Sequence, residues 1–148
     1  MKEFENKNVV ITGASRGIGL GIAKKLASEG ANIAVLAKTD TPHPKLPGTI
    51  HTAVEEIKSY GVNSIGLKTD IRFEDQIVAA INAGVKKFGG IDICINNASA
   101  IAPLPTEATE TKRYDLMQEI NSRGTFLTSK HCLPYLKKSS HAHILTLS

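Results

Sequence analysis

The sequence has few aromatic residues and few cysteines. It contains four phenylalanines, three tyrosines and no tryptophan, and its basic residues are dispersed in pairs rather than clustered. Nucleic-acid binding needs a clustered basic surface with interleaved aromatic side chains, so the net charge of +4 does not indicate a nucleic-acid partner. The mild positive charge instead favours attraction of a small anionic ligand.

The two cysteines, Cys94 and Cys132, show no spacing typical of a disulfide framework, which favours a reducing, intracellular setting. No apolar run approaches the roughly 18–20 residues that a transmembrane segment requires, and the first residues lack the apolar core of a secretory signal. His141 and His143 form a His-x-His pair, but no cysteine or acid stands nearby, so we expect no metal site.

Short apolar runs alternate with amphipathic stretches along the chain, which is typical of βα units on a parallel sheet. The sequence therefore predicts an α/β fold with one Rossmann-type, doubly wound parallel sheet. The first strand would be central, and the ligand crevice would lie at the carboxyl ends of the strands. The predicted strands span 8–12, 32–37, 64–69, 91–95 and 143–147, and the predicted helices span 17 to about 30, 49–60, 74–88 and about 111 to just before Pro134.

Two details of this pattern can be checked directly. The first helix is expected to turn one apolar face inward, formed by Ile18, Ile22, Leu26 and Ala27. The last strand, 143–147, has the composition of a buried strand, and we expect it to have no neighbour in the sheet within these residues.

A glycine-rich turn joins the first predicted strand to the first helix, with the sequence Thr12-Gly13-Ala14-Ser15-Arg16-Gly17-Ile18-Gly19. Gly13 allows a tight turn, Gly17 allows close approach of a pyrophosphate, and Gly19 allows close packing of helix and strand. Exposed N–H groups at the helix start then favour a negative charge. An ordinary turn is the alternative, but the strand before and the helix after favour dinucleotide binding by the residues from Gly13 to Gly19.

The end of the second strand bears on the choice between NAD and NADP. NAD-binding Rossmann units usually place an acid there to accept from the ribose hydroxyls, and that acid would repel the 2′-phosphate of NADP. Here the position holds Lys38, and the nearest acid, Asp40, lies two residues beyond it. Arg16 can approach the same phosphate and grip it through two charge-assisted hydrogen bonds. The sequence therefore predicts NADP, the alternative being that both cations are ordinary surface residues.

The spacing Gly-x3-Gly-x-Gly resembles the TGxxxGIG fingerprint of the classical short-chain dehydrogenase/reductase family. Further matches follow in order, with Asp70 after the third strand, Asn96-Asn97-Ala98 after the fourth strand and Asn121 in the long helix. The resemblance covers essentially the entire chain. It implies a Rossmann-type oxidoreductase that transfers a hydride between nicotinamide and a carbonyl or alcohol group.

The resemblance also implies roles for residues beyond the glycine turn. Asp70 would meet the adenine ring through its carboxylate, with Ile71 in the apolar wall of that pocket. Asp70 could also cap the next helix, and both roles can hold at once. Asn96 and Asn97 would support the central sheet and border the cofactor, and Ala98 would lie close to it. We expect Asn96 to touch the ligand, the alternative being a purely structural role, and Ser99 stands where the family usually has glycine.

Asn121 matches the asparagine that helps to hold a proton-relay water in the family, which makes it a supporting catalytic residue. A polar residue in an amphipathic helix needs partners for its amide, so hydrogen bonding between helices is the alternative.

Other family positions have no counterpart in the sequence. The family's acid–base pair is Tyr-x3-Lys, but Tyr60, Tyr114 and Tyr135 are each followed four residues later by a serine or a glutamine. Ser148 lies at or one residue before the usual serine position and is not assigned a role. We therefore expect residues 1–148 to be a single dinucleotide-binding domain that lacks its carboxyl-terminal part after the fifth strand.

Several segments, including Pro42-His43-Pro44-Lys45-Leu46, resemble one branch of the family more closely. This closer resemblance implies a lipid-like substrate, a sterol-carrier domain further along the chain, and residence in peroxisomes or mitochondria. A homo-oligomer is possible for the full-length protein. The alternative to an NADP-dependent enzyme is a regulatory Rossmann protein that senses NADP(H) without catalysis.

Residues 1–148 on their own are expected to fold poorly and to turn over no substrate. The reason is that the last strand would leave backbone groups unpaired and that the Tyr-x3-Lys pair is absent. Thermal unfolding followed by circular dichroism, together with an NADPH oxidation assay, checks both statements. A cooperative melt with measurable oxidation would refute them.

Overall fold

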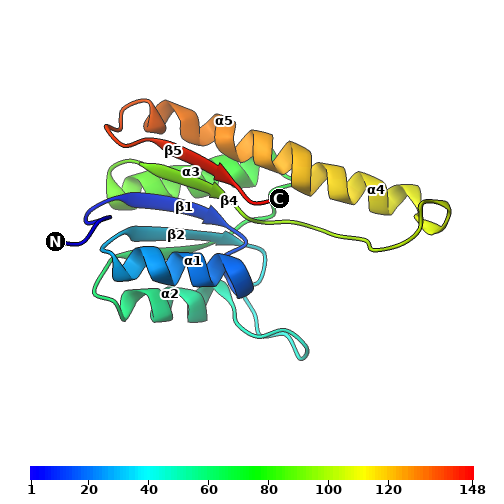
Figure 1. Ribbon diagram of the computed structural model, residues 1–148, viewed down its shortest axis with the longest axis horizontal. Coiled ribbons are helices and arrows are strands. Elements are labelled where there is room, and N and C mark those ends of the chain that lie inside the picture. Colours follow the sequence, from blue (N-terminus) through cyan, green and yellow to red (C-terminus); the bar gives the residue numbers. More distant parts are fainter.

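Five parallel strands form one sheet in the order β3-β2-β1-β4-β5 in the computed structural model, which describes residues 1–148 (Figure 1). The central position of β1 is the one predicted from the sequence, and the doubly wound α/β fold is confirmed. The strands are β1 (Asn8–Thr12), β2 (Asn32–Ala37), β3 (Ser64–Lys68), β4 (Ile93–Asn96) and β5 (His143–Thr146).

Helices cover both faces of the sheet. The helices α1 (Gly17–Ser28) and α2 (Ile50–Lys58) lie on one face, and α3 (Glu74–Phe88) and α5 (Thr125–Leu136) lie on the other (Figure 1). Between β4 and α5 the chain forms a short 3₁₀ turn (Thr106–Ala108), helix α4 (Thr111–Met117) and a π-helical segment (Gln118–Gly124). None of these helices combines the length and the apolarity that crossing a membrane requires.

Each face of the sheet has its own apolar core, because every strand of a covered parallel sheet buries side chains on both sides. The α1–α2 side buries Ile11, Ile33 and Ile57, and the α3–α5 side buries Ile77 and Ile81, each at most 1% exposed. Helix α2 begins in a capping box, in which the Thr49 hydroxyl accepts from the amide of Thr52 at 3.2 Å.

The inward face of α1 differs from the predicted one. Its fully buried side chains are Ala23 and Ala27, Ile22 and Leu26 are only partly buried, and Ile18 is 71% exposed. Small side chains let the helix lie close to β1 and β2. Ile18 stands in the first turn of α1, where it borders the cavity described below instead of the core.

The predicted long helix is also different in detail. The π-helical segment 118–124 interrupts it, and Pro134 lies inside α5 rather than beyond its end. A proline inside a helix removes one backbone hydrogen bond. The helix continues for two more residues because Leu136, which is 2% exposed, anchors the last turn in the core.

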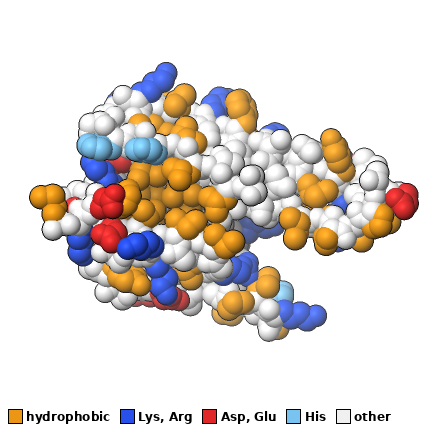
Figure 2. All heavy atoms as spheres, in the orientation of Figure 1, with side chains coloured by type: hydrophobic (Ala, Val, Ile, Leu, Met, Phe, Trp, Pro, Cys, Tyr) orange, Lys and Arg blue, Asp and Glu red, His pale blue; other side chains and the backbone are white.

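Strand β5 pairs with β4 from Ile93↔His143 to Asn96↔Thr146, so the prediction that it lacks a neighbour is wrong. The prediction of a buried strand is wrong too, since all four of its residues are exposed. On the α1 side of the sheet, no helix covers β5, and a groove of about 490 Å³ runs beside it. Figure 2 shows the apolar side chains that gather there, next to the histidines at the start of β5.

Truncation of Ile81 to alanine tests the core on the α3 side. Ile81→Ala is expected to lower the free energy of unfolding by about 2–5 kcal/mol, because it leaves a cavity at a side chain that is 1% exposed. Ile101→Ala, at a side chain that is 79% exposed, is the matched control and should change stability by less than about 0.5 kcal/mol. Denaturant unfolding of the complete protein measures the free energy of unfolding of both variants. Equal losses of stability in the two would contradict the assignment of the core.

Candidate functional site

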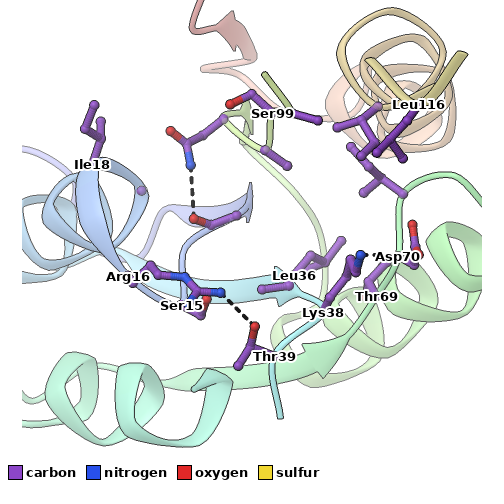
Figure 3. A pocket seen from close by; sticks show the side chains of 18 residues that line it. Ser15, Arg16, Ile18, Leu36, Lys38, Thr39, Thr69, Asp70, Ser99 and Leu116 are labelled. Carbon is purple, nitrogen blue, oxygen red and sulfur yellow. Dashed lines mark hydrogen bonds and ion pairs between the residues drawn. The ribbon is translucent and has the colours of Figure 1, made fainter. Parts of the chain in front are cut away.

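A cavity of about 610 Å³ lies at the carboxyl ends of β1, β2, β3 and β4 (Figure 3). All the residues predicted to bind a cofactor line it except Ala14 and Gly17. Ala14 is fully buried in the core on the α1 side. The prediction of a ligand crevice at this end of the sheet therefore agrees with the geometry, whereas the binding role of each residue stays a prediction.

The glycine turn forms the floor of the cavity between β1 and α1. Gly13 and Gly17 have φ angles of 69° and 57°, in the left-handed region that favours glycine. A Cβ on Gly17 would meet nothing within 4 Å, so the backbone there is open to an approaching ligand. Helix α1 begins after Arg16 with no side-chain cap and no acid in its first turn. Its amide groups and its partial positive charge remain available to an anion.

Asn97, at the exit of β4, ties the glycine turn to the neighbouring strand. Its Nδ2 donates to the carbonyl oxygens of Thr12 and Gly13, each at 3.1 Å. In return, Thr12 Oγ1 accepts from the amides of Asn97 at 3.1 Å and Ala98 at 3.0 Å. These four bonds hold the two sides of the cavity together.

Asn96 is 3% exposed and does not line the cavity, contrary to the expectation that it touches the ligand. Its Nδ2 donates to Ser129 Oγ in α5 at 3.0 Å, while its Oδ1 is buried without a partner. Its side chain therefore joins β4 to α5 behind the site. Ser99, in contrast, lines the cavity and is exposed.

Two cations stand at the end of β2, as the sequence predicts. Arg16 Nη2 donates to Thr39 Oγ1 at 2.8 Å, and Arg16 Nη1 is buried without a hydrogen-bond partner. The Lys38 side chain is 60% exposed, and its Nζ lies 3.9 Å from Asp70 Oδ2 (Figure 3). An anion placed between Arg16 and Lys38 would meet positive charge from both sides.

The two acids nearest to these cations are paired with other residues. Asp70 lines the cavity, but Arg72 donates to both of its carboxylate oxygens, with Nε 3.0 Å from Oδ1 and Nη2 2.6 Å from Oδ2. This hydrogen bonding by Arg72 lowers the pKa of Asp70 below its usual value. Asp40 Oδ2 lies 3.0 Å from Lys68 Nζ, and that hydrogen bond lowers the pKa of Asp40.

The alternative role for Asp70, capping of α3, is wrong. The N-cap of α3 is Phe73, and no side chain caps it. Asp70 instead accepts from the amide of Arg72 at 3.1 Å, in a turn that also orients the Arg72 side chain. Contact of Asp70 with adenine stays a prediction, and such a contact would share the carboxylate with Arg72.

Asn121 lies in the π-helical segment and is exposed. Its Oδ1 accepts from the amide of Ala100 at 2.9 Å, and its Nδ2 donates to the carbonyl of Ala100 at 2.8 Å. The amide is therefore satisfied by a loop that lines the cavity, not by another helix. Gly124 ends the segment against Ile71, where a Cβ would lie 2.6 Å from Ile71 Cδ1.

Seven lining residues were not predicted. Three of them surround Lys38 at the end of β2 and could have been found from that position alone. The other four come from the β3 exit, the loop after β4 and the helices after it, and they depend on long-range packing that has no local pattern. The seven are Leu36, Ala37, Thr39, Thr69, Ala100, Leu116 and Ile120.

The remaining candidate groups lie away from this cavity. No three histidine, cysteine or acidic side chains are grouped as metal ligands would be. Cys94 and Cys132 are buried free thiols, and a hydrogen bond between them, with burial, raises the pKa of Cys132. A raised pKa keeps the thiol protonated and therefore unreactive.

Comparison with known proteins gives one consistent result. The family model described as short chain dehydrogenase matches residues 7–148. Hydroxysteroid dehydrogenase-like protein 2 from Bos taurus is 60% identical over 140 residues, which are 95% of this chain and 34% of that protein. This identity agrees with the closer resemblance inferred from the proline-rich segment. The chain spans about a third of the length of the curated relatives that it matches.

Two solved structures show the same arrangement. A short chain dehydrogenase from Mycobacterium thermoresistibile is 50% identical, with a TM-score of 0.96, and the match covers 99% of this chain and 52% of that one. A xylitol dehydrogenase with bound NAD+ is 25% identical, with a TM-score of 0.87 over 98% of this chain and 54% of that one.

Substitution of Gly19 tests the contact that closes the glycine turn. A Cβ on Gly19 would clash with Asn97 Nδ2 and lie 2.5 Å from the carbonyl oxygen of Gly13. Gly19→Ala is therefore expected to lower the melting temperature and to weaken dinucleotide binding by more than about tenfold, which corresponds to 1.4 kcal/mol.

Gly21→Ala is the matched control on the same helix, since a Cβ there meets nothing within 4 Å. It should stabilise the protein by roughly 0.5–1 kcal/mol, because alanine has the higher helix propensity. Thermal melts and calorimetric titration with NADP+ measure both variants. Similar behaviour of the two would show that close packing does not require glycine at position 19.

Proposed function

Because the chain belongs to the short chain dehydrogenase family, we propose that it forms the cofactor-binding part of an NADP-dependent oxidoreductase. The reaction proposed is hydride transfer between the nicotinamide and a carbonyl or alcohol group of the substrate. The observation that carries the proposal is the pair Arg16 and Lys38 at the end of β2, where neither neighbouring acid is free.

The residues present fit a dinucleotide. The open backbone at Gly17 and the uncapped start of α1 suit a pyrophosphate, and the unpartnered Arg16 Nη1 suits a further anion. The bound cofactor would supply or accept the hydride. The apolar walls formed by Leu36 and Ile71 would exclude water from the adenine side of the cavity.

Preference for NADP follows from the charges. An acid at the position of Lys38 would accept from the ribose hydroxyls of NAD and repel a 2′-phosphate. Lysine at this position attracts a 2′-phosphate and offers no acceptor to the ribose hydroxyls. Arg16 adds a planar donor that suits phosphate oxygens. The xylitol dehydrogenase structure holds NAD+, so cofactor choice differs among proteins that share this fold.

Asn121 is the supporting catalytic residue in this proposal. It acts through Ala100, whose backbone it holds at both the amide and the carbonyl, and Ala100 lines the cavity. The Tyr-x3-Lys pair that would complete the acid–base chemistry does not occur among residues 1–148.

The finer properties of the protein are proposed from the resemblance. They are a lipid-like substrate, homo-oligomer formation at full length, and location in peroxisomes or mitochondria. The side chains of Ile101 and Leu104, in the loop that follows Ala100, are exposed and suit an apolar substrate. NADP binding without turnover by the complete protein would favour the regulatory sensor instead.

Charge reversal at Lys38 tests the cofactor preference. Lys38→Asp in the complete protein is expected to lower the ratio of NADP+ to NAD+ affinity by at least about tenfold. The reason is that a hydrogen bond to a charged group contributes roughly 1.5–3 kcal/mol and the new carboxylate would repel the phosphate. Calorimetric titration with each dinucleotide gives the ratio.

Lys138→Asp makes the same change of net charge at an exposed turn away from the cavity, and it should leave the ratio unchanged. An unchanged ratio in Lys38→Asp would refute the assignment of Lys38. A change in both variants would attribute the effect to the overall charge of the protein.

A further inference from the structure

Building on the proposed preference for NADP, we infer that Thr39 is a positioning residue that holds the Arg16 guanidinium in place for the 2′-phosphate. Thr39 carries no charge, and its importance comes from where β2 places its hydroxyl. Thr39 offers the guanidinium one hydrogen bond from a rigid acceptor, and the rest of the guanidinium is left unpaired.

The bond to Thr39 is the only polar contact of the Arg16 side chain. Nη2 donates to Thr39 Oγ1 at 2.8 Å, and no carboxylate lies within ion-pair distance of the guanidinium. Figure 3 shows the arginine reaching from the start of α1 across to the end of β2. A long side chain without this contact would sample many rotamers, and binding would have to overcome that loss of entropy.

Thr39 is itself held firmly, which makes it a useful anchor. Its carbonyl oxygen accepts from the amide of Ile50 at 2.8 Å, so the first turn of α2 fixes its backbone. Threonine is branched at Cβ and has few χ1 rotamers, so its hydroxyl has a defined direction. The loop that follows returns to the glycine turn, where a Cβ on Gly48 would lie 2.7 Å from the carbonyl of Ser15.

The rest of the guanidinium is left for a ligand. Arg16 Nη1 is buried and has no partner, which is costly for a charged donor unless something else satisfies it. The acids that could neutralise it are engaged elsewhere, with Asp40 paired to Lys68 and Asp70 paired to Arg72. An oxygen of a phosphate monoester supplies the missing acceptor and the opposite charge.

A purely structural role for the same bond makes a different prediction. If Thr39 only joined β2 to the glycine turn, its loss would weaken NAD+ and NADP+ binding equally, since both dinucleotides lie on that turn. If Thr39 positions Arg16, its loss affects only the dinucleotide that carries the 2′-phosphate.

The experiment measures NADP+ and NAD+ affinity by calorimetric titration in the complete protein. Thr39→Val keeps the shape and removes the hydroxyl, and it should weaken NADP+ binding about tenfold and NAD+ binding less than about twofold. Thr39→Ser keeps the hydroxyl and should restore NADP+ affinity. Thr41→Val is the matched control, at an exposed threonine two residues further along, and should change neither affinity.

A double-mutant cycle shows whether Thr39 acts through Arg16. In the Arg16→Met background, Thr39→Val should cause no further loss of NADP+ affinity, because the group that it positions is gone. An equal loss of both dinucleotides in Thr39→Val, or a full additional loss in the Arg16→Met background, would overturn the inference.

The wild-type protein separates this inference from the proposed function. If the wild-type protein prefers NADP+ and Thr39→Val keeps that preference, the role of Thr39 is overturned and the proposed cofactor stands. A wild-type protein that binds NAD+ as well as NADP+, or better, overturns the proposed cofactor and the role of Thr39 with it.

Discussion

The crosslink between Thr12 and Asn97 is the interaction on which the site depends. Two hydrogen bonds join these two residues directly. Two more join Asn97 to the carbonyl of Gly13 and the amide of Ala98 to Thr12, so that the exits of two neighbouring strands are held together. The crosslink works only at very short range, and this is why Gly13 and Gly19 have no room for a side chain. The sheet supplies the parallel strands, but this contact sets the spacing between the floor of the cavity and its opposite wall.

Around this rigid centre, charge is distributed unevenly. The acids near the end of β2 are each matched to a cation, with Arg72 serving Asp70 and Lys68 serving Asp40. Arg16 is matched to no acid and hydrogen bonds only to a neutral hydroxyl. The positive charge of Arg16 is therefore not neutralised by any acid, in a cavity whose other walls are largely uncharged. A ligand with a single extra phosphate is the kind of partner that such an arrangement distinguishes from an otherwise identical one.

The sequence predicted the parallel sheet, its central first strand and the place of the cavity, because these follow from local patterns: alternation of apolar runs, and glycine at fixed spacing. The predictions were wrong at positions where tertiary packing, rather than local pattern, decides the structure. Ile18 fits the helical period of the core but borders the cavity from the first turn of α1. Pro134 is tolerated in a helix because Leu136 anchors the last turn. The place of Thr39 beside the cavity follows from its position next to Lys38, but the role inferred for its hydroxyl could not be predicted, since it acts through an arginine 23 positions away.

The π-helical segment 118–124 has a consequence for the length of the chain. A π-turn contains more residues than an α-turn while the helix keeps its direction. Loss of one residue there would let the segment revert to ordinary helix while α4 and α5 keep their faces, because a π-turn holds about one residue more than an α-turn. The wide turn therefore accommodates an additional residue without turning the helices on either side of it. The number of residues in the segment, rather than their identity, decides whether the helix is regular there.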